Sequence, residues 1–258
     1  MQNRRERRRQ ERQQRKASGE TNIRRHEDAE HHPESSKSFK NFTLKPKNDE
    51  QRKYINTIKN FPFVVGMGTV GSGKTFIPAV MAAQMLQEGL IERIYIVRPN
   101  VELGRPIGFI KGGMWEKMEH WIAPVMDGLE SVMDRSFIKY LVEKEVIMAV
   151  PVAYLRGRTF SNCFVIGDEF QNLTVEEVKC FCQRQGEYTK VVVTGDLAQK
   201  DLGKHKKTGL DALIAIDEMY ERKPLAIIKL ETCVRSDEAN FFYEAFEELE
   251  KEDDFKHE

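Results

Sequence analysis

Short apolar runs alternate with longer stretches of helical periodicity from Asn48 onward. Runs of four to eight apolar residues are typical of buried strands, whereas apolar residues three and four positions apart are typical of helices. Strands separated by helical crossovers form a parallel sheet with helices on both faces. We therefore predict an α/β domain with a largely parallel sheet, whose strands are expected at 63–67, 93–97, 146–150, 163–167, 191–194 and 225–230.

A glycine-rich segment follows the first predicted strand and fits the phosphate-binding pattern G-x-x-x-x-G-K-[ST]. Its glycines let backbone N–H groups turn toward phosphate oxygens, Lys74 supplies a cation, and the Thr75 hydroxyl can ligate Mg²⁺. A helix is predicted from Phe76 to Glu88, so the phosphate would meet a helix N-terminus. A turn without a ligand is the alternative, and the strand–loop–helix context argues against it. The predicted nucleotide ligands here are Gly68, Thr69, Val70, Gly71, Ser72, Gly73, Lys74, Thr75 and Phe76.

Polar clusters also follow other predicted strands: Arg98-Pro99 the second, Asp168-Glu169 the fourth, and Gly195-Asp196 with Gln199 the fifth. The carboxyl ends of parallel strands lie at one edge of the sheet, where ligands bind in open α/β folds. We therefore expect these residues and the glycine-rich loop to line a single rim.

The residues on this rim predict hydrolysis of the bound triphosphate. Asp168 is expected to hold Mg²⁺, Glu169 to accept a proton from an attacking water, and Gln199 to orient that water or sense the γ-phosphate. An acidic helix start is the alternative for the two carboxylates, since Thr174 and Glu177 fit a capping box. Charge on the transferred phosphoryl group needs a guanidinium, and the candidates are Arg98, Arg156, Arg158, Arg184 and Arg235.

Charge is unevenly distributed, although the 258-residue chain has a net charge of zero. Residues 1–47 contain fourteen Lys and Arg against seven Asp and Glu, a net of +7, which leaves −7 for the remainder. This segment is polar and aperiodic, so we predict a mostly disordered basic tail ahead of a single domain at 48–258. Binding to nucleic acid phosphates and a merely solubilising role are both consistent with such a tail.

The C-terminal segment 237–258 is acidic and is predicted to be helical. Apolar residues recur in it at helical spacing and are expected to dock on the domain while the acids face water. These residues are Phe241, Phe242, Ala245, Phe246 and Leu249.

Composition predicts a soluble, cytoplasmic protein. No apolar stretch is long enough for a membrane span, and the first residues are too charged for a secretory signal. The four cysteines lack a paired C-x-x-C pattern, so reduced thiols are expected in place of zinc ligands or disulfides.

Taken together, these motifs resemble the PhoH family, whose ATPase domain is similar to the first RecA-like domain of superfamily 1 helicases. The resemblance extends collinearly from Asn48 to Glu244. Its most specific elements are Arg-Gly-Arg-Thr at 156–159 and Asp-Glu-Phe-Gln-Asn at 168–172. Departures from the family pattern include Thr69-Val70, Arg105, Lys111, Phe170 and Ser236.

The resemblance implies roles for individual residues. Gln51 would read the adenine edge with Tyr54 nearby, and Arg235 would act on the γ-phosphate, in its own or a neighbouring subunit. Lys74, Thr75, Asp168, Glu169 and Gln199 would serve as inferred from the pattern. It further implies ATP hydrolysis with Mg²⁺, a homo-oligomer such as a hexamer, and coupling to single-stranded RNA or DNA.

Two other functions stay open at this point. One is a nucleotide-gated binding protein with slow hydrolysis, whose interface would include Arg105, Lys111, Phe170 and the basic tail. The other is a small-molecule kinase, although the pairing of Asp168-Glu169 with Gln199 favours water as the nucleophile.

Overall fold

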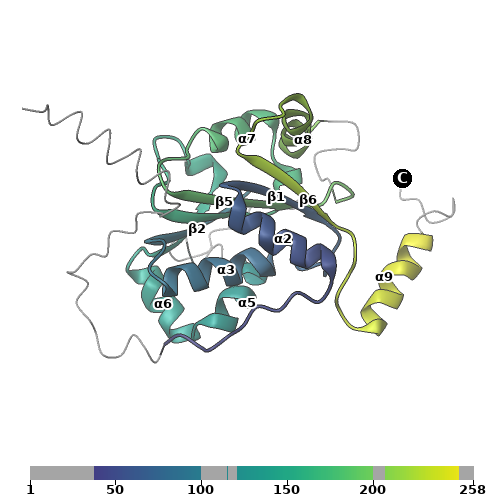
Figure 1. Cartoon of the computed structure of the whole chain (residues 1–258), viewed down its shortest axis with the longest axis horizontal. Helices are drawn as coiled ribbons and strands as arrows, with labels where there is room; N and C mark the ends of the chain where they lie inside the picture. Colours follow the sequence, from purple (N-terminus) through teal and green to yellow (C-terminus); the bar gives the residue numbers. More distant parts are fainter. Residues whose placement is uncertain (1–37, 100–114, 116–120, 200–206, 250–258) are drawn as a thin grey trace, which may run out of the picture. The chain divides into compact units, whose positions relative to one another are not determined.

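The computed structural model describes residues 38–99, 115, 121–199 and 207–249 (Figure 1). Within them, six strands form one parallel sheet in the order β3-β2-β4-β5-β1-β6. The α/β prediction is therefore confirmed, and each strand lies within two residues of its expected bounds. The strands are β1 (Phe63–Gly68), β2 (Arg93–Arg98), β3 (Ile147–Pro151), β4 (Cys163–Gly167), β5 (Thr189–Gly195) and β6 (Leu225–Leu230).

Helices cover both faces of the sheet (Figure 1). On one face lie α2 (Asp49–Asn60), α3 (Phe76–Gln87), α5 (Ala123–Val132) and α6 (Arg135–Glu143), and on the other lie α7 (Val175–Cys182) and α8 (Gly209–Met219). Alternate strand residues serve the two apolar cores, since Val64 and Val192 belong to the first and Val65 and Val193 to the second. No helix among the described residues is long and apolar enough to cross a membrane.

The order of the strands sets the geometry of the rim. Strand β5 lies between β1, which leads into the glycine-rich loop, and β4, which leads into Asp168. The sequence predicted a parallel sheet covered by helices, and it did not specify this order of strands. Because all six strands are parallel, their carboxyl ends meet at one edge, and the polar residues that follow them are brought together.

Packed structure begins earlier than the predicted boundary at Asn48. Phe39 forms an antiparallel bridge with Met133 and an edge-on contact with Phe137, with ring centroids 5.1 Å apart. Phe42 and Leu44 also pack on the first core. Residues 38–47 therefore run over the domain surface as an extended, alternating segment, a pattern too short to stand out within a polar region.

The C-terminal helix α9 (Asp237–Leu249) forms where predicted, but its apolar side chains do not dock. Phe241, Phe242 and Phe246 are 64%, 59% and 62% exposed. The docking prediction is wrong for this chain, because helical spacing shows that an apolar face exists and does not specify what covers it. Residues 250–258 lie outside the described part.

Tyr54 supports the glycine-rich loop from beneath. Its ring is fully buried, and its hydroxyl donates to the Lys74 carbonyl at 3.0 Å. A Cβ on Gly66 would lie 2.4 Å from the Tyr54 hydroxyl oxygen, so this close approach requires glycine. The expectation that Tyr54 lies near the adenine stays a prediction; its hydroxyl contacts the loop backbone, and burial raises its pKa.

We predict that Gly66→Ala lowers the free energy of unfolding by about 1–3 kcal/mol, because the added methyl group overpacks against a rigid ring. Urea denaturation would measure the change. In a Tyr54→Leu background the same substitution should cost less, since the ring is gone. An equal cost in both backgrounds would contradict the contact.

Candidate nucleotide site

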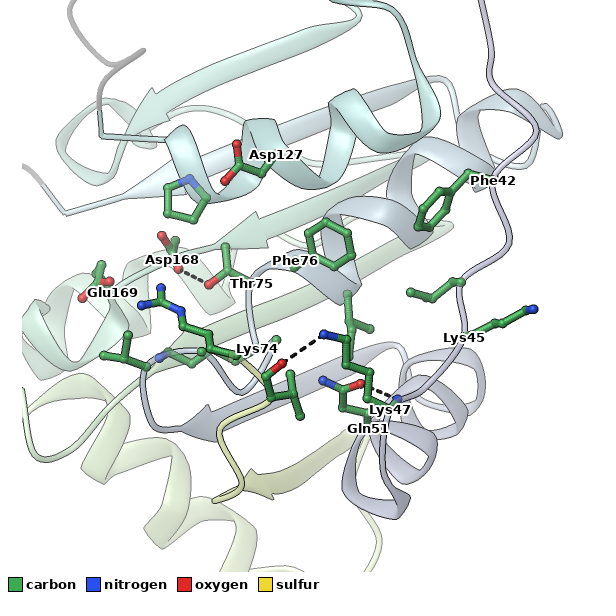
Figure 2. Close-up of a pocket in the computed structure, with 18 of the residues that line it drawn as sticks. Phe42, Lys45, Lys47, Gln51, Lys74, Thr75, Phe76, Asp127, Asp168 and Glu169 are labelled. Carbon is green, nitrogen blue, oxygen red and sulfur yellow. Dashed lines mark hydrogen bonds between the residues drawn. The ribbon is translucent and has the colours of Figure 1, made fainter. Parts of the chain in front are cut away.

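A cavity of about 690 Å³ opens at the carboxyl rim of the sheet (Figure 2). Its volume lies within the range usual for ligand sites. Most of the residues predicted to bind nucleotide or act on it line this one cavity: Gln51, Val70, Gly71, Gly73, Lys74, Thr75, Phe76, Asp168, Glu169, Gln199 and Arg235. The structure thus brings most of the predicted site residues together around one cavity, and the role of each stays a prediction.

The remaining predicted ligands shape the loop from behind. Gly68 ends β1, and the Ser72 hydroxyl, which is almost fully buried, donates to the Thr69 carbonyl at 2.9 Å. Gly71 and Gly73 have φ values of 78° and 89°, a region that favours glycine. Lys74 Nζ donates to the same Thr69 carbonyl at 3.1 Å, so the ammonium lies over the loop.

Gln51 joins the loop to the segment that precedes α2. Its side-chain Nε2 donates to the Ser72 carbonyl at 2.9 Å, and its Oε1 accepts from the Lys47 N–H at 2.9 Å. The amide is 5% exposed and lines the cavity, with one N–H and one lone pair left over. The adenine-reading role stays a prediction, and bridging the two segments is a structural role already visible.

Phe42 is a cavity residue that the sequence analysis did not assign. It lines the cavity together with Phe76, so two aromatic rings contribute apolar surface to it (Figure 2). Assigning residues 1–47 to a tail concealed it, although Phe39, Phe42 and Leu44 recur as apolar positions just ahead of α2.

Asp168 is the centre of the acidic end of the cavity and is 2% exposed. Its Oδ1 accepts from the Thr75 hydroxyl at 3.0 Å and from the Thr194 hydroxyl at 2.6 Å, and its Oδ2 lies 3.4 Å from Arg98 Nη1. The hydroxyl and carboxylate oxygens of Thr75 and Asp168 are hard donors that suit Mg²⁺. The described residues hold no cluster of three or more His, Cys, Asp or Glu that could bind a metal ion.

Glu169 is held by a glutamine whose role the sequence analysis missed. Gln171 is fully buried; its Nε2 donates to Glu169 Oε2 at 2.6 Å, and its Oε1 accepts from the Asp196 N–H at 3.1 Å. The same Nε2 lies 3.4 Å from the Gln199 carbonyl. Gln171 thus connects the Glu169 carboxylate to the loop after β5. Its place in the 168–172 motif is the sequence feature that could have pointed to this role.

Glu169 itself adopts a left-handed backbone conformation with φ of 60°, immediately before the short helix η3 (Phe170–Asn172). The capping box of Thr174 and Glu177 is also present, at the start of α7. The two interpretations of the acids are therefore compatible, because the capping box and the cavity use different carboxylates.

Two of the five candidate arginines reach the site. Arg98 contacts Asp168 and Glu169 and donates to the Trp121 carbonyl, and Arg235 lines the cavity. The Arg235 Cγ and Cδ atoms would lie 2.9 Å from a Cβ on Gly71 of the same chain. Arg184 instead donates to the Cys180 carbonyl, while Arg156 and Arg158 are exposed away from the cavity lining.

The segment after β6 holds Arg235 in place. The Val234 N–H donates to the Gly71 carbonyl at 3.0 Å, and Lys47 Nζ donates to the Val234 carbonyl at 3.0 Å. A Cβ on Gly71 would lie 2.7 Å from the Cys233 sulfur, which places that thiol directly against the loop.

Known proteins similar to this chain carry the name PhoH. The PhoH-like protein of Mycobacterium tuberculosis H37Rv is 40% identical over 176 residues, covering 68% of this chain and 50% of that protein. The PhoH-like protein of Bacillus subtilis is 38% identical over 177 residues, covering 69% and 56%, and Protein PhoH of Escherichia coli K12 is 36% identical over 194 residues, covering 74% and 54%. The chain thus spans little more than half the length of these relatives.

Among solved structures, the Pif1 helicase from Candida albicans matches 80% of this chain and 44% of its own with a TM-score of 0.44 and 13% identity. The SWI2/SNF2 ATPase core domain of Sulfolobus solfataricus matches with a TM-score of 0.37 and 17% identity, covering 62% of this chain and 34% of its own. The sequence model of the family described as PhoH-like protein matches residues 43–247, most of the described structure. The resemblance inferred from the motifs is confirmed: the chain belongs to the PhoH family.

Proposed function

We propose that this chain binds ATP with Mg²⁺ and hydrolyses it in the rim cavity. The observation that carries the proposal is the 3.0 Å hydrogen bond from the Thr75 hydroxyl to Asp168, two residues 93 positions apart in sequence. It joins the last residue of a phosphate loop to an acid at the end of a parallel strand, the pairing that an Mg²⁺-bound triphosphate needs.

The residues around this pair support a division of roles. The loop N–H groups and Lys74 would bind the phosphates, and Mg²⁺ would neutralise their charge when bound. Glu169, held by Gln171, would accept the proton of the attacking water. Arg235 would stabilise charge on the γ-phosphate of its own chain's nucleotide, because its side chain already lies on its own loop.

Coupling to single-stranded RNA or DNA is part of the proposal. Its support is the excess of seven positive charges in residues 1–47 and the exposed side chains of Arg156, Arg158 and Arg235. A homo-oligomer such as a hexamer stays a prediction. Because the Arg235 side chain lies close to Gly71 of its own chain, the proposal does not require a neighbouring subunit to supply that arginine. Sizing of the nucleotide-bound chain would test it.

We expect Glu169→Gln to lower kcat for ATP by about 100-fold or more with little change in KM, because it removes the base and leaves the phosphate contacts. Lys74→Ala should reduce turnover to background. Phosphate release measures both. Glu176→Gln, an exposed carboxylate on α7, is the matched control and should turn over normally. Full activity in Glu169→Gln would exclude its role as base.

Alkylation of the thiols offers a second test, independent of turnover. Burial raises the pKa of Cys163 and of Cys182 to about 12, so both should resist iodoacetamide near pH 8. Cys233 lies against Gly71, so MgATP should slow its modification. Cys180 on α7 is the internal control, with the same rate with and without nucleotide. Peptide mass spectrometry measures each site, and a Cys233 rate unaffected by MgATP would place the nucleotide elsewhere.

A nucleotide-gated binding protein with slow hydrolysis is the second candidate. The exposed aromatic side chains of α9 favour it, because they offer a protein partner an apolar face. Phe170 no longer supports it, since that ring is fully buried, and Arg105 and Lys111 lie outside the described residues. Partner capture that needs ATP and survives Glu169→Gln would favour this function.

A further inference from the structure

The Arg-Gly-Arg-Thr motif forms an exposed turn whose side chains the nucleotide cavity does not use. It follows β3 and the short helix η2 (Val152–Tyr154). The Arg158 N–H donates to the Leu155 carbonyl at 3.1 Å, and Gly157 has a φ of 81°. Leu155 is fully buried and Phe160 almost so, while residues 156–159 are all exposed. The turn is therefore anchored at both ends and presents its side chains from a fixed backbone.

Tyr154, just ahead of the turn, has an exposed ring that nothing in the described structure covers. It is 60% exposed and makes no ring or cation contact with a described residue. Tyr140 on α6 provides the contrast. It is 45% exposed, but it stacks on Phe137 with centroids 6.1 Å apart, and Lys144 Nζ lies 5.7 Å from its ring centre.

The two arginines of the turn form no ion pair with a described residue, although Arg158 acts electrostatically on Tyr95. Among the described residues no carboxylate lies within ion-pair distance of Arg156 or Arg158, whereas Arg98 and Arg52 are both paired. A Cβ on Gly157 would meet no atom within 4 Å, so the space over the turn is open. Two unpaired guanidinium groups thus flank an open surface next to a free aromatic ring.

The segment that contains this surface leaves the sheet at the rim of the acid cluster and leads to the start of β4. Pro151, the last residue of β3, pairs in register with Arg98, which contacts Asp168 and Glu169. Strands β3 and β4 are separated only by β2, or about 10 Å at the usual strand spacing. The connection that holds the turn therefore begins at the rim, two strand positions from β4, which leads into Asp168.

We propose that Tyr154, Arg156 and Arg158 form a binding surface for single-stranded nucleic acid, with one base stacked on Tyr154 and the phosphates on either side held by the arginines. Stacking on an aromatic ring and contacts from cations are how proteins bind single strands without reading sequence. Tyr154 is the one exposed large apolar residue between 141 and 174. The inference rests on the proposed coupling to nucleic acid and assigns it a surface.

Binding of the full chain to a labelled oligouridylate of about 20 nucleotides, followed by fluorescence anisotropy, tests this surface; the length spans several bases on either side of one stacking site. Tyr154→Ala should weaken binding about fivefold or more, with Tyr154→Phe near wild type because it keeps the ring. Replacing both Arg156 and Arg158 by Ala should flatten the dependence of log affinity on log salt by about 1.4, or about 0.7 per phosphate contact. Tyr154→Ala should leave that slope unchanged.

The matched control replaces Tyr140, Lys139 and Lys144 by Ala, an exposed tyrosine with two cations on α6, and should leave affinity unchanged. An equal loss in this control would show a general effect of charge and overturn the inference. Wild-type affinity in a variant lacking Tyr154, Arg156 and Arg158 would also overturn it, assigning the surface to some other partner while the proposed function stands. Failure of the wild-type chain to bind the oligonucleotide would overturn both.

Photocrosslinking separates this surface from the basic residues near the N-terminus. An oligouridylate containing 4-thiouridine should crosslink within residues 152–160, as located by peptide mass spectrometry. Crosslinks confined to other residues would contradict the assignment even if affinity had fallen in the variants.

Discussion

The buried carboxylate of Asp168 is the constraint on which the rest of the site depends. A carboxylate that is 2% exposed is unfavourable unless hydrogen bonds and a nearby cation compensate it. Its compensation comes from three directions: Thr75 from the loop after β1, Thr194 from β5 and Arg98 from β2. A parallel sheet with β4 between β2 and β5 brings these strand ends together. The hydrogen bonds and the ion pair of Asp168 therefore depend on this order of strands.

The phosphate loop is held in a similar way by elements far away in the sequence. Tyr54 contacts the Lys74 carbonyl from beneath, Gln51 contacts Ser72 from one side, and Val234 contacts Gly71 from another. Each contact is made to the loop backbone and leaves the cavity side accessible. The loop therefore has its shape before a phosphate arrives, which lowers the ordering cost of binding.

The sequence predicted the features that repeat along the chain. Apolar runs gave the strands within two residues, and the rule that ligands bind at the carboxyl ends of parallel strands gave the rim. Contacts between single side chains left no such signal. The bridge from Gln171 to Glu169 and Asp196, and the support of the loop by Tyr54, depend on pairs that only the folded chain brings together.

Apolar patterns also failed where they were short or lacked a partner. Residues 38–47 carry three apolar side chains within a polar stretch, too few for a periodic signal, yet the folded domain offers them a surface. Helix α9 shows the opposite case, since its pattern is clear and its aromatic residues remain exposed. Periodicity describes an element's own faces, and burial depends on what the tertiary structure places opposite them.

Arg98 ends the strand that lies between β3 and β4, and its side chain contacts Asp168. Its strand pairs with β3, which leads to the Arg-Gly-Arg-Thr turn, and with β4, which leads to Asp168. A shift of β3 would be transmitted through this register to the Arg98 guanidinium. Loss of its contact with Asp168 would leave a buried carboxylate with less compensation, and burial makes that loss far larger than at an exposed ion pair.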